Sequence, residues 1–151
     1  MFCDVLEESG TIDPDLVEDM LSKDDNIGSV LAVHLFGNAA QMSRLTATCA
    51  AHQFLLIEDL VQAFGCRFAH GSLFGSSGDV SVTWFGYSKL FDTGDGGTIM
   101  TNDPSLADTL RSLETQIPAT LREVADFAAG HKILYHQIVS LGAPDDRFLD
   151  S

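Results

Sequence analysis

A lysine that closes an aromatic, strand-like segment is the residue of this chain best suited to covalent chemistry. Lys89 ends the run Val82-Thr-Trp-Phe-Gly-Tyr-Ser-Lys89, and a lysine amine can condense with the aldehyde of pyridoxal phosphate as a Schiff base. Asp59 ends an earlier apolar segment, and a carboxylate there could keep the pyridinium nitrogen of that cofactor protonated, so that the ring accepts electrons. A lysine and a carboxylate at the tips of neighbouring strands therefore predict a pyridoxal-phosphate site.

Both residues have an ordinary structural alternative. Most lysines are solvated surface residues, although a lone lysine after so apolar and aromatic a segment fits that role less well. Asp59 could equally end a strand or cap a helix, and without Lys89 that interpretation would be preferred. The two residues together favour catalysis.

The segments around these residues predict a β-α-β unit. Ile27–Phe36 is nearly continuously apolar, as expected of a parallel strand covered on both faces. Gln41–Gln53 predicts a helix, and Phe54–Ile57 a second buried strand that Glu58 and Asp59 stop. A right-handed crossover would leave both strand ends on one edge of the sheet, where ligands of open parallel sheets bind. The residues expected near one face of the helix are Met42, Leu45, Cys49 and His52.

The remaining elements follow from turn and cap signals. The glycines of Gly94–Gly97 could cradle a phosphate, but a tight turn next to the lysine is favoured because no Gly-Lys-Ser/Thr follows. Proline just inside a start signal predicts two helices. The expected segments are a helix from Asp13 to Leu21, a strand Val80–Phe85, a strand Thr98–Thr101 that is antiparallel or at an edge, a helix from Asn102 through Leu113 and a packing helix Leu121–Leu141.

Composition excludes several classes of partner. The 151 residues suffice for one domain, and 8 Lys and Arg against 22 Asp and Glu give a formal charge of −14. This charge argues against nucleic acid and anionic membranes. The three cysteines are widely spaced, with no metal-ligand spacing, and predict reduced, buried thiols. With no leader-like or membrane-spanning segment, the chain is expected in the cytoplasm.

Several segments in order, from Phe2 to Leu113, resemble the DegT/DnrJ/EryC1/StrS sugar aminotransferase family. The resemblance implies a partial fold type I large domain, an α/β structure with a mostly parallel sheet flanked by helices. It also implies a pyridoxal-phosphate-dependent aminotransferase that transfers an amino group, usually from Glu or Gln, to a keto sugar nucleotide or ketocyclitol. The matching segments are Thr11-Ile-Asp-Pro-Asp-Leu16, Val33-His-Leu-Phe-Gly37, Ile57-Glu-Asp-Leu-Val-Gln-Ala63, Gly78-Asp79, Tyr87-Ser-Lys89 and Gly94-Asp-Gly-Gly97.

The resemblance also implies roles for individual residues. Lys89 matches the Schiff-base lysine, Asp59 the partner of the pyridinium nitrogen, and Gln62 a residue against the cofactor ring or its phenolic oxygen. Gln62 could instead face solvent or close a helix turn. His34 also matches a family histidine, and a buried, hydrogen-bonded core histidine is favoured there over direct proton transfer. No metal ligand is expected.

The chain departs from the family pattern in two ways. Trp84 stands five residues before the lysine, where the family usually has a phosphate-binding Ser, and alternation would turn the adjacent Thr83 to the other face. An indole there either blocks the phosphate or indicates a remodelled pocket. The resemblance also leaves the phosphate-binding helix, the stacking aromatic, the small domain and an Asn/Arg motif unmatched. Residues 1–117 are therefore expected to be the central part of the large domain, 118–142 a packing helix and 143–151 a flexible tail.

Three hypotheses remain open from the sequence. The chain could be the lysine-bearing half of a split aminotransferase, a noncatalytic relic or regulatory subunit that no longer binds pyridoxal phosphate, or a truncated form of a homodimeric transaminase. In the first case a complementary chain would supply the missing parts. Exposed apolar edges and faces predict a hetero-oligomer with such a chain, or failing that a homodimer.

Overall fold

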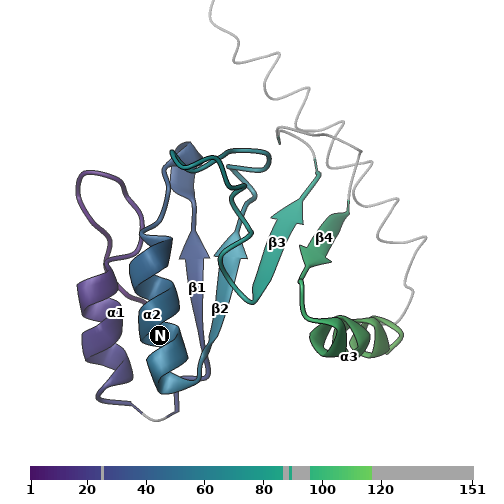
Figure 1. Cartoon of the computed structure of the whole chain (residues 1–151), viewed down its shortest axis with the longest axis horizontal. Helices are drawn as coiled ribbons and strands as arrows, with labels where there is room; N and C mark the ends of the chain where they lie inside the picture. The colour runs from purple at the N-terminus through teal and green to yellow at the C-terminus, as the bar shows by residue number, and fades with distance from the viewer. Residues whose placement is uncertain (25, 87–88, 90–95, 117–151) are drawn as a thin grey trace, which may run out of the picture. The chain divides into compact units, whose positions relative to one another are not determined.

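The computed structural model describes residues 1–24, 26–86, 89 and 96–116 (Figure 1). The expected helix 121–141, the tail, the boundaries of the division at residues 117 and 142, and Gly94 lie outside the described residues. The described elements are α1 (Pro14–Leu21), β1 (Ser29–Val33), the 3₁₀ turn η1 (Leu35–Gly37), α2 (Met42–His52), β2 (Leu55–Asp59), β3 (Val80–Trp84), β4 (Gly97–Met100) and α3 (Pro104–Glu114).

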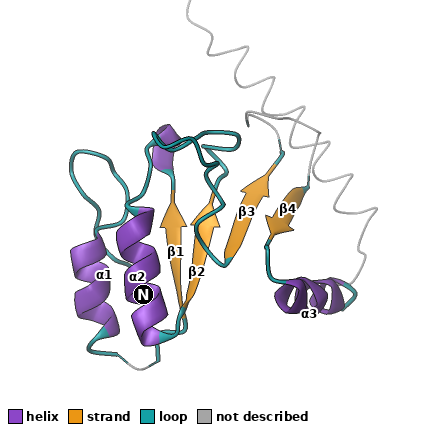
Figure 2. Cartoon of the chain, viewed as in Figure 1, coloured by secondary structure: helices purple, strands orange, loops and turns teal. Residues whose placement is uncertain are grey.

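The strands form one mostly parallel sheet, which confirms the predicted fold class. The strand order is β1-β2-β3-β4, with β1, β2 and β3 parallel and β4 antiparallel to β3 (Figure 2). The carboxyl ends of the three parallel strands therefore lie on the same edge of the sheet (Figure 1). β4 is both antiparallel and at the edge of this sheet, as the turn pattern predicted.

Two strand boundaries differ from the sequence prediction. β1 ends at Val33, because the chain turns at η1, where Phe36 has a left-handed φ of 53° and an exposed side chain. β2 continues through Glu58 and Asp59, which pair in register with Ala32 and Val33. The prediction that these two acids stop the strand is wrong, because a carboxylate with enough hydrogen-bond donors can be buried within a sheet.

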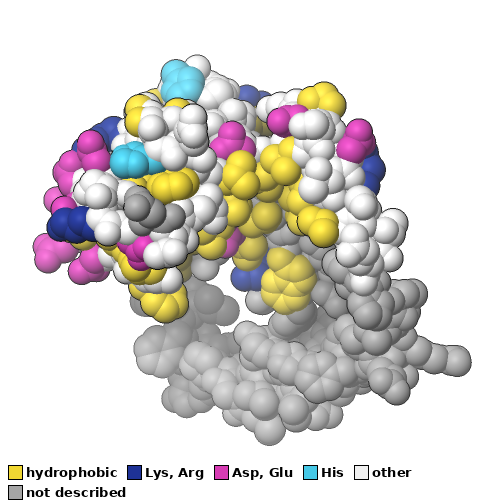
Figure 3. Space-filling view, turned by 90° about the horizontal axis from the view of Figure 1, so that it is seen from below, with side chains coloured by type: hydrophobic (Ala, Val, Ile, Leu, Met, Phe, Trp, Pro, Cys, Tyr) yellow, Lys and Arg dark blue, Asp and Glu magenta, His cyan; other side chains and the backbone are white. Residues whose placement is uncertain are grey.

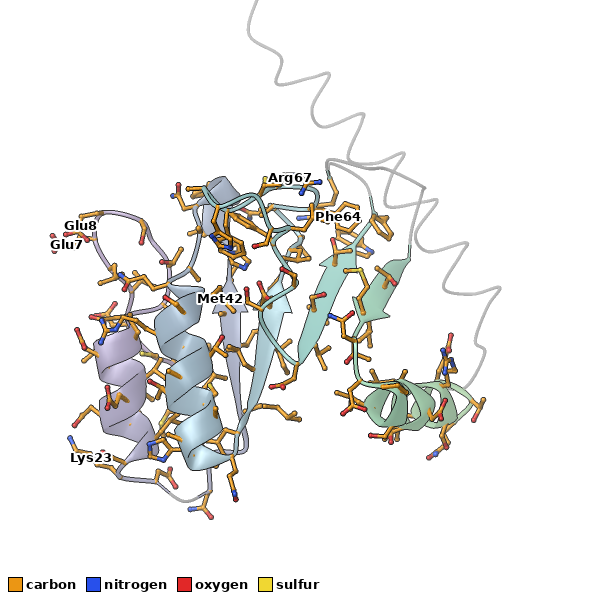
Figure 4. All side chains as sticks on the ribbon, viewed as in Figure 1. Glu7, Glu8, Lys23, Met42, Phe64 and Arg67 are labelled. Atoms are coloured by element: carbon orange, nitrogen blue, oxygen red, sulfur yellow. The ribbon has the colours of Figure 1, made fainter. Side chains whose placement is uncertain are left out.

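The core lies between α2 and one face of the parallel strands. Leu45 and Cys49 of α2 pack with Val30, Ala32 and Leu56 of the sheet, while α1 lies beside α2. Met42, labelled in Figure 4, is also buried, as its helical spacing predicted. His52 at the last position of α2 is only half-buried and stacks on Phe54.

Leu45→Ala should be strongly destabilising. The side chain is fully buried between α2 and the sheet, and removing it leaves a cavity that costs about 2–5 kcal/mol. Urea denaturation followed by circular dichroism measures the change in the free energy of unfolding. Ser43→Ala, on an exposed position of the same helix, should change it by less than about 0.5 kcal/mol. Equal effects of the two substitutions would contradict this packing.

The three cysteines are all free. Cys49 is buried, and its burial, followed by the nearby negative charge of Asp79, raises the pKa of its thiol. Cys3 and Cys66 are half-buried, so the prediction of buried thiols holds fully only for Cys49. Within the described ranges, no three His, Cys, Asp or Glu side chains are grouped to hold a metal ion. None of the helices described is long and apolar enough to cross a membrane.

Candidate active site

Strand register places Asp59 and Trp84 on one face of the sheet. Asp59 of β2 pairs with Val33 of β1 and Val82 of β3 in parallel register, so these three side chains point the same way. Trp84 lies two residues after Val82 and therefore projects from this same face, opposite the one that α2 covers. We call it the Asp59 face.

Lys89 lies against the Trp84 indole. Its ammonium Nζ is 5.6 Å from the centroid of the Trp84 ring, within the range of a cation–π contact. Lys89 is half-buried, and Trp84 is 42% exposed. The lysine amine is thereby held at the carboxyl edge of β3, beside the indole of the Asp59 face.

Gln62 faces the turn that follows β1. Its side-chain Oε1 accepts a hydrogen bond of 3.0 Å from the backbone N–H of Phe36, which comes from η1. The side chain of Gln62 is exposed, as the solvent-facing alternative has it, but its carbonyl oxygen is also bound to the backbone of η1. Gln62 therefore joins the loop after β2 to the turn after β1 at the same edge of the sheet (Figure 1).

Asp59 is held by its backbone and by one carboxylate oxygen. Its carbonyl oxygen accepts from the N–H of His34 at 3.1 Å, and its Oδ1 accepts from the N–H of Val61 at 2.9 Å. Asp59 is half-buried. Within the described part of the chain, no other partner of the carboxylate is seen, so one oxygen has the capacity to accept from a bound group.

An aromatic pair lies beside the same strand ends. The ring of Phe64, labelled in Figure 4 near the end of β3, meets the ring of Phe85 edge to face with a centroid distance of 5.4 Å. Edge-to-face contacts of this kind are a favoured arrangement of two aromatic rings. Phe64 thus gives Phe85, the residue that follows β3, an apolar neighbour.

Trp84 occupies the position in β3 at which the family resemblance predicted a phosphate-binding hydroxyl. Thr83 is buried on the opposite face, as alternation predicted, so its hydroxyl does not replace the missing Ser on the Asp59 face. The indole folds back over Gly86, where a β-carbon would come within 1.9 Å of the ring. A larger residue at position 86 would therefore force the Trp84 indole to move.

A buried pair lies directly beneath this edge, and sequence reasoning missed its glutamate. His34 and Glu58 are both fully buried, and His34 Nε2 is 2.9 Å from Glu58 Oε2. His34 Nδ1 accepts from the backbone N–H of Ala40 at 3.1 Å. Because an N–H only donates, Nδ1 carries no proton, and Nε2 is the nitrogen that donates to Glu58. His34 is thus the buried, hydrogen-bonded core histidine that the sequence favoured.

Glu58 also binds the loop that leads into β3. Its Oε2 accepts from the N–H of Gly75 at 2.9 Å, and its Oε1 accepts from the N–H groups of Ser77 and Gly78 at 2.8 and 2.6 Å. Burial alone would raise the pKa of Glu58, but the bonds from His34 and these three amides lower it below its usual value. The sequence feature that could have indicated this buried carboxylate was the spacing of Glu58, two residues after Leu56 and therefore on the same inward face of an apolar strand.

Glu58→Gln should destabilise the protein in a pH-dependent way. The amide of glutamine cannot accept at both ends, so at least one buried donor loses its partner at a cost of about 1–3 kcal/mol near neutral pH. The lowered pKa of Glu58 means that its stabilising contribution is present above the pKa of the unfolded chain, about 4.3 for glutamate, and is lost as pH falls through the lower folded-state pKa.

The measurement is the difference in free energy of unfolding between wild type and Glu58→Gln from pH 7 to acid. This difference should shrink as the pH falls below about 4. Glu7→Gln serves as the matched control, since Glu7 is an exposed residue of the amino-terminal loop (Figure 4), and should change stability by less than about 0.5 kcal/mol. A Glu58→Gln difference that is constant over the whole range would show that the carboxylate is not ionised in the fold.

Comparison with known proteins decides the family. The model of the DegT/DnrJ/EryC1/StrS aminotransferase family matches residues 1–131, a longer stretch than the motifs alone indicated. This chain belongs to that family. The family uses pyridoxal phosphate, and the amine of Lys89 and the carboxylate of Asp59 are groups that fit this cofactor, whereas Trp84 is not a phosphate ligand.

Individual relatives resemble the chain over most of its length. It is 34% identical over 107 residues to the dTDP-3-amino-3,4,6-trideoxy-alpha-D-glucose transaminase of Streptomyces venezuelae, covering 71% of this chain and 28% of that protein. It is 33% identical over 113 residues to the L-glutamine:2-deoxy-scyllo-inosose aminotransferase of Streptomyces kanamyceticus, covering 75% and 26%. A crystal structure of a family member from Brucella abortus superposes with a TM-score of 0.67 at 35% identity, covering 74% and 31%. The chain thus spans less than a third of the length of each of these proteins.

Proposed function

We propose that this member of the family is the lysine-bearing part of a pyridoxal-phosphate-dependent aminotransferase. The observation that supports it most directly is the strand register, which puts Asp59 and Trp84 on one face at the carboxyl edge of the sheet, with the ammonium of Lys89 against the Trp84 ring. Ligands of open parallel sheets bind at that edge. The proposed substrates are an amino donor and a keto sugar nucleotide or a ketocyclitol. The names of the two relatives from Streptomyces contain a dTDP-linked amino sugar in one case, and L-glutamine with 2-deoxy-scyllo-inosose in the other.

In this proposal each residue has a distinct role. Pyridoxal phosphate supplies an aldehyde and an electron-accepting ring. Lys89 holds the cofactor covalently and moves the proton at the reacting carbon of the substrate. Asp59 accepts a hydrogen bond from the ring nitrogen and keeps it protonated. Gln62, fixed by the backbone of Phe36, lies against the cofactor ring or its phenolic oxygen.

A spectroscopic titration tests the proposal. Addition of pyridoxal phosphate to the chain, alone and in the assembly in which it functions, should give a visible absorbance band that is absent from the cofactor mixed with a control protein. Amino transfer from glutamine or glutamate to a keto sugar nucleotide or ketocyclitol should accompany the band. A chain that stays colourless under both conditions would refute the proposal.

A noncatalytic relic or regulatory subunit is the alternative, and Trp84 is the observation that favours it. The indole stands where a small phosphate ligand was expected and folds over Gly86 beside Lys89. In this alternative the fold serves to contact a partner protein, and the cofactor is not bound. The same titration separates the two functions, because only the aminotransferase becomes coloured.

The chain is also proposed to function in an assembly, with a complementary chain or a second copy. The Asp59 face leaves large apolar side chains exposed: Leu31, Leu55, Trp84 and Ile99 are 51%, 44%, 42% and 55% exposed. Figure 3 views the chain from below the strands of Figure 1 and shows hydrophobic side chains gathered there, with acidic side chains at several points around them. Exposed apolar surface of this kind in a soluble protein normally contacts a partner.

Light scattering at micromolar concentration should therefore show a species larger than the 16.3 kDa chain. Leu31→Ser with Ile99→Ser, which makes this face polar at two exposed positions, should shift the population toward the monomer. Lys23→Ser, on an exposed position after α1, is the matched control and should leave the mass unchanged. A wild-type monomer with cofactor bound would contradict this proposal.

A further inference from the structure

We propose that the buried His34–Glu58 pair is a positioning unit, which sets the places of Asp59, Gln62 and the strand that leads to Lys89 without touching the cofactor. The proposal rests on the proposed function for the roles of those three residues. Its structural part concerns contacts within the described fold alone. Three connections support it: one to Asp59, one to Gln62 and one to the start of the strand that precedes Lys89.

The first connection runs to Asp59. Successive side chains of β2 alternate, so Glu58 points into the core while Asp59 points to the other face. The backbone N–H of His34 donates to the carbonyl oxygen of Asp59 at 3.1 Å, and the side chain of His34 donates to Glu58 at 2.9 Å. Residues 58 and 59 are therefore held to the end of β1 by both the backbone and the side chain of one histidine.

The second connection runs to Gln62. The Ala40 N–H donates to His34 Nδ1 at 3.1 Å, which ties the two ends of the segment 34–40 together. Within this closed segment Phe36 has a left-handed φ of 53°, a conformation that a bulky residue adopts only when the surroundings enforce it. That conformation directs the Phe36 N–H to Gln62 Oε1 at 3.0 Å. The histidine thus fixes the turn that orients the glutamine.

The third connection runs to the strand that precedes Lys89. Glu58 accepts from the N–H groups of Gly75, Ser77 and Gly78, and Gly78 lies two residues before β3. The loop is pressed against this carboxylate: a β-carbon at Gly75 would lie 2.6 Å from the Leu60 side chain, and one at Gly78 would lie 2.7 Å from the Leu56 carbonyl oxygen. The start of β3 is therefore set by Glu58.

A purely structural role for the pair makes a different prediction. If Glu58 only satisfies the loop amides, its removal loosens Gly75, Ser77 and Gly78 and lowers stability, with no effect at the site. A positioning unit must also loosen two amides that Glu58 does not touch. These are Val61, whose N–H donates to Asp59 Oδ1, and Phe36, whose N–H donates to Gln62 Oε1.

Amide hydrogen exchange of the full chain tests this directly. Glu58→Gln should speed exchange at the loop amides and also at Val61 and Phe36, by about fivefold for each bond weakened by the net value of one hydrogen bond. His34→Gln replaces two nitrogens of a rigid ring by an amide whose oxygen and nitrogen share one flexible end. The bond from Ala40 should therefore be weakened, and exchange at Ala40 and Phe36 should rise first. Faster exchange confined to Gly75–Gly78, or spread evenly over α1 and α2, would overturn the proposal.

Cofactor affinity gives the second readout, with Leu45→Ala as the matched control. Leu45 is fully buried in the core but has no bond to the site residues, so its truncation lowers stability without releasing them. Titration with pyridoxal phosphate, at a temperature where all variants are folded, should show a larger loss of affinity in Glu58→Gln and His34→Gln than in Leu45→Ala. If the loss of cofactor affinity in the three variants only follows their loss of stability, the positioning role is overturned.

The two readouts keep this inference distinguishable from the proposed function. If the wild-type chain and its assembly bind no pyridoxal phosphate, the proposed function fails. The exchange at Val61 and Phe36 then decides alone whether the pair positions Asp59 and Gln62. If the cofactor binds but both amides are unaffected in the variants, the positioning unit fails and the proposed function stands.

Discussion

Lys89→Ala should abolish amino transfer, by at least about 1,000-fold, because the covalent attachment and the proton transfer depend on one amine. Losing the contact with Trp84 should lower the free energy of unfolding by only about 0.5–1 kcal/mol, the value of an exposed cation–π pair. The variant should therefore remain folded. The measurement combines turnover with borohydride reduction in the presence of pyridoxal phosphate, which should label Lys89 in the wild type and leave the variant unlabelled.

Lys23→Ala is the matched control for this substitution. Lys23 is an exposed lysine whose ammonium pairs with Asp19 at 2.6 Å, so its removal should leave turnover and labelling unchanged. Peptide mapping identifies the labelled residue. A covalent label on Lys23 or Lys132 in the wild type, with none on Lys89, would end the assignment of Lys89.

Asp59→Asn should lower turnover by about 100-fold or more, the usual cost of removing one preorganised charge-stabilising contact. A neutral amide cannot hold the proton on the ring nitrogen, so the ring becomes a weaker electron acceptor. The hydrogen bond from Val61 can still be accepted by the amide oxygen, and the backbone bond from His34 is unchanged. Stability should therefore change little, and kcat should fall much more than the affinity for the cofactor.

Asp19→Asn controls for the loss of one negative charge. Asp19 is exposed on α1 and pairs with Lys23, and exposed ion pairs contribute little to stability. Its removal should leave kcat within the error of the assay. Full activity in Asp59→Asn would show that a different group holds the ring nitrogen.

Local sequence patterns determined the parallel sheet and the helix between its first two strands. The near-continuous apolar run before Gly37 and the helical spacing of Met42, Leu45 and Cys49 predicted β1 and α2, and both elements are present. Local cap signals also predicted the start of α1, since Asp13 accepts from the backbone of Asp15 and Pro14 occupies the first turn. Signals of this kind involve residues within one turn or one strand, so they are readable from the chain alone.

The order of the short motifs likewise predicted the family. The segments around Gly37, Asp59 and Lys89 are too short to be specific one at a time. Their shared order along the chain is specific, and the family model that matches residues 1–131 confirms it. The roles of Lys89, Asp59 and Gln62 stay predictions, which the experiments above test.

Only the tertiary structure decided what lies beneath the candidate site. His34 and Glu58 are separated by 24 positions in the chain, and their contact depends on the parallel register of β1 and β2. The amides that bind Glu58 come from a loop 17 to 20 positions further on. A glutamate after an apolar strand is usually exposed, so sequence reasoning placed it at the strand end. Burial became favourable because four donors converge on one carboxylate, and that convergence exists only in the folded chain.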